Sequence, residues 1–234
     1  MDGRCLVLDF DGTVLDTEEP VYRSWWELWD EHGHQLDREE WQLVIGTDAG
    51  FDPLAELQRR LGRDLDATTV ERRRRRRDVL QADHDVREGI VAWLDEADAS
   101  GVPVGIASSS PEAWVDGHLR RLGLRSRFTV VVCAGDGVPP KPDPTSYRVA
   151  CERMGADPRR SVAVEDSPHG VRAAVGAGLF ALAVPHPLTV DLDFSAADLV
   201  VDSLAGLSLD DVLRRSGDRL AEWDPGPTLE RGQV

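Results

Sequence analysis

Positive charge is the first thing that this 234-residue chain has too little of. Its 27 Lys and Arg residues face 43 Asp and Glu residues, which gives a formal net charge of −16 and a pI near 4.7. Nucleic acids and anionic lipid surfaces are negatively charged themselves, so such a protein repels them. We therefore expect no nucleic acid and no membrane as a partner, and we attribute the acidity to solubility.

Cysteine and long apolar runs are scarce as well. The three cysteines lie far apart and include no CxxC pair, so neither a disulfide framework nor a zinc site is expected. The apolar run near the N-terminus is too short for a signal peptide, and no run approaches the roughly 20 residues of a membrane span. These absences favour a reduced, cytoplasmic protein, which we expect to be a monomer.

Apolar residues make up 41% of the chain, which is enough to close a core. Short runs that are apolar on both faces alternate with helical patterns, as in a parallel sheet buried between two helical layers. The alternation predicts an α/β fold with a doubly wound, Rossmann-like parallel sheet. The expected strands are residues 5–9, 102–107, 128–133, 161–165, 179–184 and 198–201, and the expected helices between them include residues 89–99, 112–122, 144–154 and 169–177.

One stretch, residues 17–83, breaks this alternation because it contains only helical patterns. About 65 residues are far too many for one crossover connection, so we predict a small helical domain inserted after the first strand. The predicted division is an α/β catalytic core at residues 1–15 and 84–216, a helical cap at residues 16–83, and a loosely held, Pro- and Gly-containing tail at residues 217–234.

Six consecutive arginines, Arg72 to Arg77, invite a nucleic-acid interpretation. At successive helical positions they point all round the axis, and acids flank them, so we interpret the run as a solvated, salt-bridged helix. The alternative is a phosphate-attracting patch beside a cleft. Four tryptophans of the insert are expected to form its core, with a substrate-stacking wall as the alternative; they are Trp25, Trp26, Trp29 and Trp41.

Chemically active side chains follow four of the expected strands, three of them directly and the third strand past a loop. Because active sites of parallel sheets gather at the carboxyl ends of strands, these side chains should converge on one edge. They comprise two acids, a serine cluster, one lysine and two further acids, namely Asp9 and Asp11, then Ser108, Ser109 and Ser110, then Lys141, then Glu165 and Asp166.

Such a set of groups indicates phosphoryl chemistry. Four carboxylates cannot all stay ionised close together without a cation, and hard oxygen ligands suit Mg²⁺. A lysine and a hydroxyl supply positive charge and donors for a phosphoryl oxygen, and an ionised Asp then becomes a competent nucleophile toward phosphorus. A second Asp two residues further on, past a turn that contains Gly12, can protonate the leaving oxygen and later activate water.

The residues that carry this chemistry also carry a resemblance. The motifs DFDGTVLDTE, ASSS, KPDP and EDSPHG follow one another in order, each after an expected strand. In these motifs the chain resembles the haloacid dehalogenase superfamily, in its phosphatase and phosphomutase branch with a helical cap after the first strand, as in β-phosphoglucomutase-like proteins. The resemblance extends over about residues 4–213. It implies a Mg²⁺-dependent phosphatase acting on a small phosphorylated metabolite through an aspartyl-phosphate intermediate.

The resemblance also implies roles for individual residues. Asp9 corresponds to the nucleophile and a Mg²⁺ ligand, and Asp11 to the general acid/base, whose backbone carbonyl also binds the metal. Ser108 corresponds to the hydroxyl that binds the transferring phosphoryl group, beside the backbone N–H of Ser109, and Lys141 to the charge clamp on nucleophile and phosphate. Asp166 corresponds to a direct metal ligand and Glu165 to a second one, direct or through water. For Ser110 and Ser167, helix capping is the competing interpretation.

Related chemistries remain alternatives. A dehalogenase needs neither Mg²⁺ nor a second catalytic Asp, so the acids argue against it. A β-phosphoglucomutase-type mutase carries a histidine where this chain has Val21, and a cap arginine that Thr47, Asp48 and Ala49 do not supply. Simple hydrolysis is therefore favoured over mutase chemistry. A phospho-receiver signalling domain also groups acids around Mg²⁺, but the DxDGT spacing and the helical insert argue against it.

Substrate selection is expected on the insert, but the sequence does not identify the metabolite. The expected residues are Glu18, Tyr22, Trp25, Gly46, Thr47 and Asp48. Two linkers, near residues 16–17 and 83–88, would let the insert swing as a lid that excludes solvent. A cap packed rigidly against the core is the alternative.

Overall fold

The computed structural model describes residues 3–42, 45–46, 50–82, 84–135 and 137–222, and it contains one six-stranded parallel sheet. The strand order is β3-β2-β1-β4-β5-β6, so the chain first winds from β1 to one edge and then returns to build the other half. The predicted doubly wound α/β fold is confirmed. The strands are β1 (Leu6–Leu8), β2 (Val104–Ser108), β3 (Val130–Cys133), β4 (Val162–Glu165), β5 (Phe180–Ala183) and β6 (Leu199–Val200).

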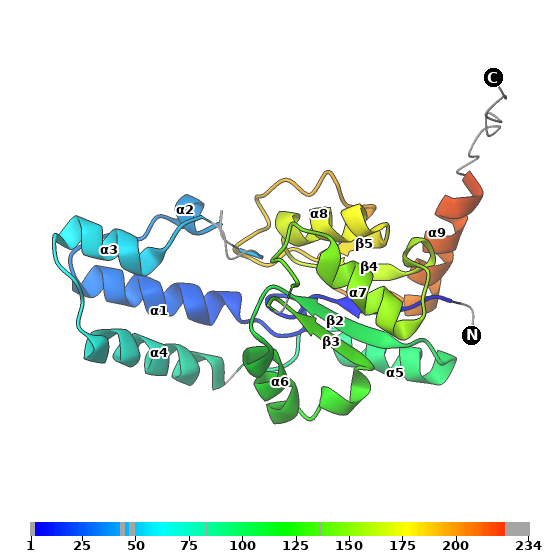
Figure 1. The fold of residues 1–234 in the computed structure, drawn as a ribbon, viewed down its shortest axis with the longest axis horizontal. Coiled ribbons are helices and arrows are strands. Elements are labelled where there is room, and N and C mark those ends of the chain that lie inside the picture. Colours follow the sequence, from blue (N-terminus) through cyan, green and yellow to red (C-terminus); the bar gives the residue numbers. More distant parts are fainter. Residues whose placement is uncertain (1–2, 43–44, 47–49, 83, 136, 223–234) are drawn as a thin grey trace, which may run out of the picture.

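Helices cover both faces of the sheet (Figure 1). Side chains alternate along β1, so that Leu6 and Leu8 pack into one apolar cluster while Cys5 and Val7 pack into the other. The first cluster contains side chains from α5 (Ile90–Ser100), α6 (Glu112–Arg121) and α9 (Leu209–Glu222), and the second contains side chains from α7 (Thr145–Met154) and α8 (Pro168–Ala177).

Four helices lie between β1 and α5, and the described residues of this stretch form no strand. They are α1 (Glu18–Glu31), α2 (Arg38–Gln42), α3 (Pro53–Leu61) and α4 (Ala67–Ala82), here called the helical insert, and they extend to one side of the sheet (Figure 1). The insert has its own apolar cluster, in which Trp29 and Trp41 are buried. Trp25 packs against that cluster, whereas Trp26 is 45% exposed, so the expected core role holds for three of the four tryptophans.

The arginine run lies on α4, and its members have different surroundings. Arg72 and Arg76 form paired hydrogen bonds with Glu31 and Glu27 of α1, which confirms the salt-bridged interpretation for them. Arg73 is buried, with its guanidinium 4.2 Å from the centroid of the Trp25 ring. The helical period thus assigns neighbouring arginines to different faces.

The predicted elements agree with the observed ones to within about two residues. The structure adds two short 3-10 helices, Arg125–Arg127 and Pro158–Arg160, and one helix at the C-terminal end. Helix α9 was not predicted, and it continues to Glu222, so the predicted start of a loosely held tail at residue 217 falls inside a helix. Ser216 is fully buried there. Residues 223–234 of that predicted tail lie outside the described residues.

None of the helices in the described part of the chain is both long enough and apolar enough to span a lipid bilayer.

Besides the two chain segments that join the insert to the core, the loop after β5 also contacts the insert. Leu188 in this loop is 8% exposed and belongs to the apolar cluster of the insert. Its carbonyl accepts a hydrogen bond from Gln42 Nε2 at 2.7 Å, and the neighbouring Pro187 carbonyl accepts one from Arg38 Nη2 at 2.7 Å.

We expect Leu188→Ala to lower the free energy of unfolding by about 2–4 kcal/mol, because it leaves a cavity in a small core. Val190→Ala, in the same loop but 59% exposed, should change it by less than about 0.5 kcal/mol. Urea unfolding followed by tryptophan fluorescence measures both changes. Equal effects of the two substitutions would contradict the packing role of Leu188.

Candidate active site

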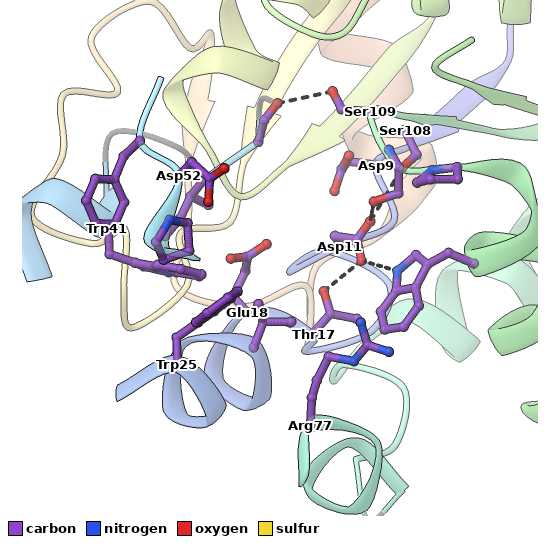
Figure 2. Close-up of a pocket in the computed structure, with 18 residues that line it drawn as sticks. Asp9, Asp11, Thr17, Glu18, Trp25, Trp41, Asp52, Arg77, Ser108 and Ser109 are labelled. Carbon is purple, nitrogen blue, oxygen red and sulfur yellow. Dashed lines mark hydrogen bonds between the residues drawn. The ribbon is translucent and has the colours of Figure 1, made fainter. Parts of the chain in front are cut away.

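A pocket of about 590 Å³ lies between the insert and the carboxyl ends of the central strands (Figure 2). This is where the strand order reverses, between β1 and its two neighbours, and ligands of doubly wound sheets bind at such a point. It is lined by four carboxylates, Asp9, Asp11, Glu18 and Asp52, and by aromatic side chains. These aromatic residues include Trp25, Trp41 and Phe51.

Lys141 is the only lysine in the sequence, and its side chain is 2% exposed. Its ammonium donates to Asp9 Oδ1 and to Glu165 Oε1, the latter at 2.6 Å. Tyr147 donates to the same Glu165 oxygen at 2.5 Å. Burial alone would lower the pKa of Lys141, but attraction to the two carboxylates outweighs it and raises this pKa above its ordinary value. The ammonium therefore stays charged beside Asp9.

Asp9, Glu165 and Asp166 form a buried acidic cluster whose ligand atoms lie within 4.8 Å of one another. Burial raises the pKa of Asp9 to about 8, although Lys141 draws it back, and burial followed by the charge of Asp9 raises the pKa of Asp166. One ammonium cannot offset three carboxylates in a buried site.

The cluster fits a hard divalent cation. Oδ2 of Asp9 and Oδ2 of Asp166 are buried and have no hydrogen-bond partner within the described part of the chain, whereas Glu165 already accepts from Lys141 and Tyr147. Unpaired carboxylate oxygens at this spacing are what Mg²⁺ needs as ligands. The carboxylate of Asp11 is not part of this cluster, and its backbone carbonyl as a metal ligand stays a prediction.

A glycine lets the turn after β1 approach the Asp166 carboxylate. Gly12 has φ +79°, and a Cβ there would lie 2.0 Å from Asp166 Oδ2. The turn between Asp9 and Thr13 therefore tolerates no side chain at this position, which gives the sequence pattern DxDG its physical reason.

The Asp11 carboxylate lies beside four hydrogen-bond donors. Its Oδ1 accepts from Thr17 Oγ1 and from Trp114 Nε1, both at 2.8 Å. Its Oδ2 accepts from Ser110 Oγ at 2.6 Å and lies 3.5 Å from Ser108 Oγ. Helix capping, the competing interpretation for Ser110, is wrong, because Pro111 is the N-cap of α6 and the Ser110 hydroxyl contacts Asp11 instead.

The serine cluster separates into distinct positions. Ser108 is 1% exposed, and its Oγ accepts from the Ser110 N–H at 3.0 Å. Ser109 Oγ accepts from the Lys141 N–H at 3.1 Å and donates to the Gly46 carbonyl at 3.2 Å, so this hydroxyl connects core and insert (Figure 2). Ser167 caps α8 through the Gly170 N–H, as the capping interpretation expected.

The residues expected to select the substrate lie only partly within the described chain. Glu18 lines the pocket, and burial together with the charges of Asp11, Asp9 and Asp16 raises its pKa to about 8. Gly46 also lines the pocket, and a Cβ there would lie 2.1 Å from Ser167 Oγ. Thr47 and Asp48 lie outside the described residues.

Residues 4–178 match the haloacid dehalogenase-like hydrolases. YhcW of Bacillus subtilis, a provisionally named phosphatase, is 37% identical over 207 residues, which are 88% of this chain and 94% of that protein. The chain belongs to the haloacid dehalogenase-like hydrolase family. The expected superfamily is confirmed, and with it the expectation of an enzyme.

Solved structures extend the similarity. The crystal structure of a CbbY mutant from Rhodobacter sphaeroides with xylulose-(1,5)-bisphosphate aligns with a TM-score of 0.73 at 30% identity, covering 91% of this chain and 99% of that one. A β-phosphoglucomutase from Clostridium difficile aligns with a TM-score of 0.73 at 20% identity, covering 94% and 100%. The fold of this haloacid dehalogenase-like hydrolase is thus that of the β-phosphoglucomutase-like proteins.

Sequence reasoning missed four residues of the site in this hydrolase. Trp114 and Thr17 donate to Asp11, and Tyr147 donates to Glu165. Arg87 donates to the Gly12 carbonyl and, at 3.2 Å, to the Val184 carbonyl, which ties the turn after β1 to the end of β5.

Arg77 lines the pocket from α4, so its position agrees with the alternative interpretation of the arginine run as a patch beside a cleft. The four-residue spacing of Arg73 and Arg77 places both on one face of α4.

The Glu165 carboxylate depends on the absence of a side chain at Gly170 in α8. A Cβ at Gly170 would lie 1.9 Å from Glu165 Cδ, and this carboxylate cannot move away without breaking its bonds to Lys141 and Tyr147. We expect Gly170→Ala to lower the free energy of unfolding by about 3 kcal/mol or more. In Gly176→Ala, on the same helix, the new Cβ meets its nearest atom at 3.5 Å, and the change should be neutral or stabilise by up to about 1 kcal/mol.

Chemical denaturation of both variants measures this difference. A Gly170→Ala protein as stable as the Gly176→Ala protein would show that Glu165 is not held in place.

Proposed function

We propose that this hydrolase is a Mg²⁺-dependent phosphatase that cleaves monoesters of small phosphorylated metabolites through an aspartyl-phosphate intermediate. The observation that carries the proposal is the Asp9 carboxylate, which has one oxygen on Lys141 and the other unpaired beside Asp166. The relatives support it, because YhcW is named as a phosphatase and the CbbY structure holds a sugar bisphosphate.

In the first half of the reaction, an Asp9 oxygen attacks phosphorus and the bond from phosphorus to the ester oxygen breaks. Asp11 transfers its proton to that leaving oxygen, so the product departs as an alcohol. Lys141 balances the charge of the nucleophile and of the incoming phosphoryl group. Ser108, which is buried beside Asp11, would donate to a phosphoryl oxygen.

In the second half, Asp11 takes a proton from a water molecule. The water oxygen attacks phosphorus, the bond to Asp9 breaks, and inorganic phosphate is released. Asp9, Asp166 and Glu165 would hold the metal ion, which when bound supplies positive charge for the phosphoryl oxygens.

The pocket favours hydrolysis over mutase chemistry. A mutase must rebind a bisphosphate in two orientations, which requires a cation at the far end of the site. Val21 lines the pocket where a mutase histidine would fall, and residues 43–53 include no basic side chain. Arg77 is the one cationic residue among those that line the pocket in the described chain, and it lies at the Asp11 end (Figure 2).

The insert would act as a cap over the core of residues 1–15 and 84–216. The aromatic wall of Trp25, Trp41 and Phe51 would then contact the leaving group and contribute to substrate selection. The contacts of Ser109 with Gly46, and of the loop after β5 with α2, would hold the cap closed and exclude water.

We propose that this enzyme is a monomer and acts in the cytoplasm. All three cysteines are free, and two of them, Cys5 and Cys151, are buried with their sulfurs 3.7 Å apart, in a hydrogen bond rather than a disulfide. Unpaired thiols this close together are what a reducing compartment maintains.

Removal of the metal should stop the reaction. We expect exhaustive EDTA treatment to lower phosphate release by at least about 100-fold, and added Mg²⁺ to restore it, because the acidic cluster loses its counter-charge. Phosphate release from a panel of sugar phosphates and phosphoglycolate measures this. Asp166→Asn should raise the Mg²⁺ concentration for half-maximal activity at least about tenfold, while the exposed control Asp202→Asn should not. Full activity after EDTA would refute the metal dependence.

Substitutions of the two aspartates should affect two different steps of the reaction. Asp9→Asn removes the nucleophile, so no phosphoenzyme should form. Asp11→Asn keeps the nucleophile but loses proton transfer, worth about 10²–10⁴ in rate, so an aryl phosphate should still label the protein while phosphate release is slow. Acid-quenched labelling with a ³²P-aryl phosphate distinguishes the variants. Equal labelling of the wild type and Asp9→Asn would rule out Asp9 as nucleophile.

A further inference from the structure

Trp114, on the core helix α6, contacts the Asp11 carboxylate, and the mechanism above gives it no role. Its indole N–H donates to Asp11 Oδ1 at 2.8 Å, beside Thr17 Oγ1, which donates to the same oxygen. The two serine hydroxyls contact the other oxygen, Oδ2. The two oxygens of the carboxylate therefore have different hydrogen-bond donors.

The chemistry of these donors differs in a way that matters for a proton-transferring residue. A hydroxyl both donates and accepts, so Ser110 or Thr17 can turn its hydrogen when Asp11 becomes protonated. An indole N–H only donates. The oxygen that faces Trp114 must therefore remain an acceptor in both protonation states, and the proton of the neutral acid lies on Oδ2. Oδ2 is the oxygen on the side of Ser108, where the phosphoryl group is expected.

We propose that Trp114 is a positioning residue for Asp11: it directs the exchanging proton to Oδ2, and Arg77 links this arrangement to the insert. The inference rests on the proposed phosphatase reaction. In the first half, the Oδ2 proton passes to the leaving oxygen as its bond to phosphorus breaks. In the second half, Oδ2 takes a proton from water as the water oxygen bonds to phosphorus and the bond to Asp9 breaks.

The contacts of the Trp114 ring fix its orientation. The Arg77 guanidinium lies 4.7 Å from the centroid of the Trp114 ring. The His118 ring packs edge-on against the same indole, with 4.3 Å between the ring centroids and an interplanar angle of 76°. Both contacts restrain rotation of the indole. Arg77 also donates to Asp78 at 2.6 Å and extends from α4 toward Thr17 (Figure 2).

Arg77 belongs to the insert and Trp114 to the core, so the contact between them exists only while α4 lies against α6. Closure of the insert would therefore complete the support of the acid/base as well as cover the pocket. The Arg73–Trp25 stack, one turn earlier on α4, lies within the insert and offers no such link.

The test compares two esters in single turnover, with release of the alcohol or phenol as the readout. An alkyl phosphate needs a protonated leaving oxygen, and p-nitrophenyl phosphate hardly does. Trp114→Phe keeps a ring beside Arg77 but removes the N–H. We expect it to slow release from the alkyl phosphate at least about tenfold and from p-nitrophenyl phosphate less than about threefold.

Two controls make the result specific. Trp26→Phe, at a tryptophan that is 45% exposed, should leave both rates unchanged. In an Asp11→Asn background the effect of Trp114→Phe should disappear, because the residue acts only through Asp11. Equal slowing of both esters, or slowing that persists in the Asp11→Asn background, would overturn the positioning role alone. A wild type that cleaves neither ester would overturn the proposed function, and this inference with it.

A second variant tests the link to the insert without disturbing the core. Arg77→Gln should slow alkyl phosphate release at least about threefold, Arg77→Lys should restore part of the loss, and the exposed control Arg75→Gln should have no effect. A rise in KM for both esters with an unchanged ratio of their rates would assign Arg77 to substrate binding and remove it from the coupling.

Discussion

The buried ammonium of Lys141 is the interaction on which the rest of the site depends. It joins Asp9 after β1 to Glu165 at the end of β4, two neighbouring strands of the sheet. Without it, adjacent strands would end in carboxylates that repel each other in a region closed to water. With it, the three carboxylates of the cluster still outnumber the one ammonium, and in the proposed function a divalent cation would balance that excess. The anionic phosphoryl group would then be attracted by Lys141 and the metal ion together.

This arrangement explains why so much of the fold and the site was predictable from the sequence. The sheet register places Leu8, Ile106 and Val164 side by side, so residues that follow these strands converge at one edge. Asp9, Ser108 and Asp166 could therefore be placed together at this edge from strand positions, whereas their roles came from the resemblance. Residues that follow parallel strands in the sequence are close in space, because parallel strands align their carboxyl ends.

Trp114, Ser110 and α9 were not predictable in the same way. Trp114 reaches Asp11 from a helix more than 100 residues further on, and the direction of an indole depends on how that helix packs. Ser110 precedes a proline and an acid, a position where a serine usually caps the following helix. Its hydroxyl instead donates to Asp11, a carboxylate that is distant in the sequence. The arginine run shows the same limit: identical residues have different surroundings, which only the packing of α4 against α1 and α6 reveals.

The connections between insert and core lie around the pocket and differ in chemistry. Ser109 and Gly46 share a hydrogen bond, Leu188 contributes an apolar contact, and Arg77 and Trp114 form a cation–π pair. Each is weak by the standards of a permanent interface, as the proposed opening and closing of the insert would require. Two of these connections involve residues that also contact the proposed catalytic groups. Ser109 accepts a hydrogen bond from the backbone N–H of Lys141, and Trp114 donates one to Asp11. A lid that made only apolar contacts would exclude water and do nothing more. In the proposed lid, contacts of this kind would make the alignment of the charged groups depend on closure, so that an open site would be both wet and misaligned.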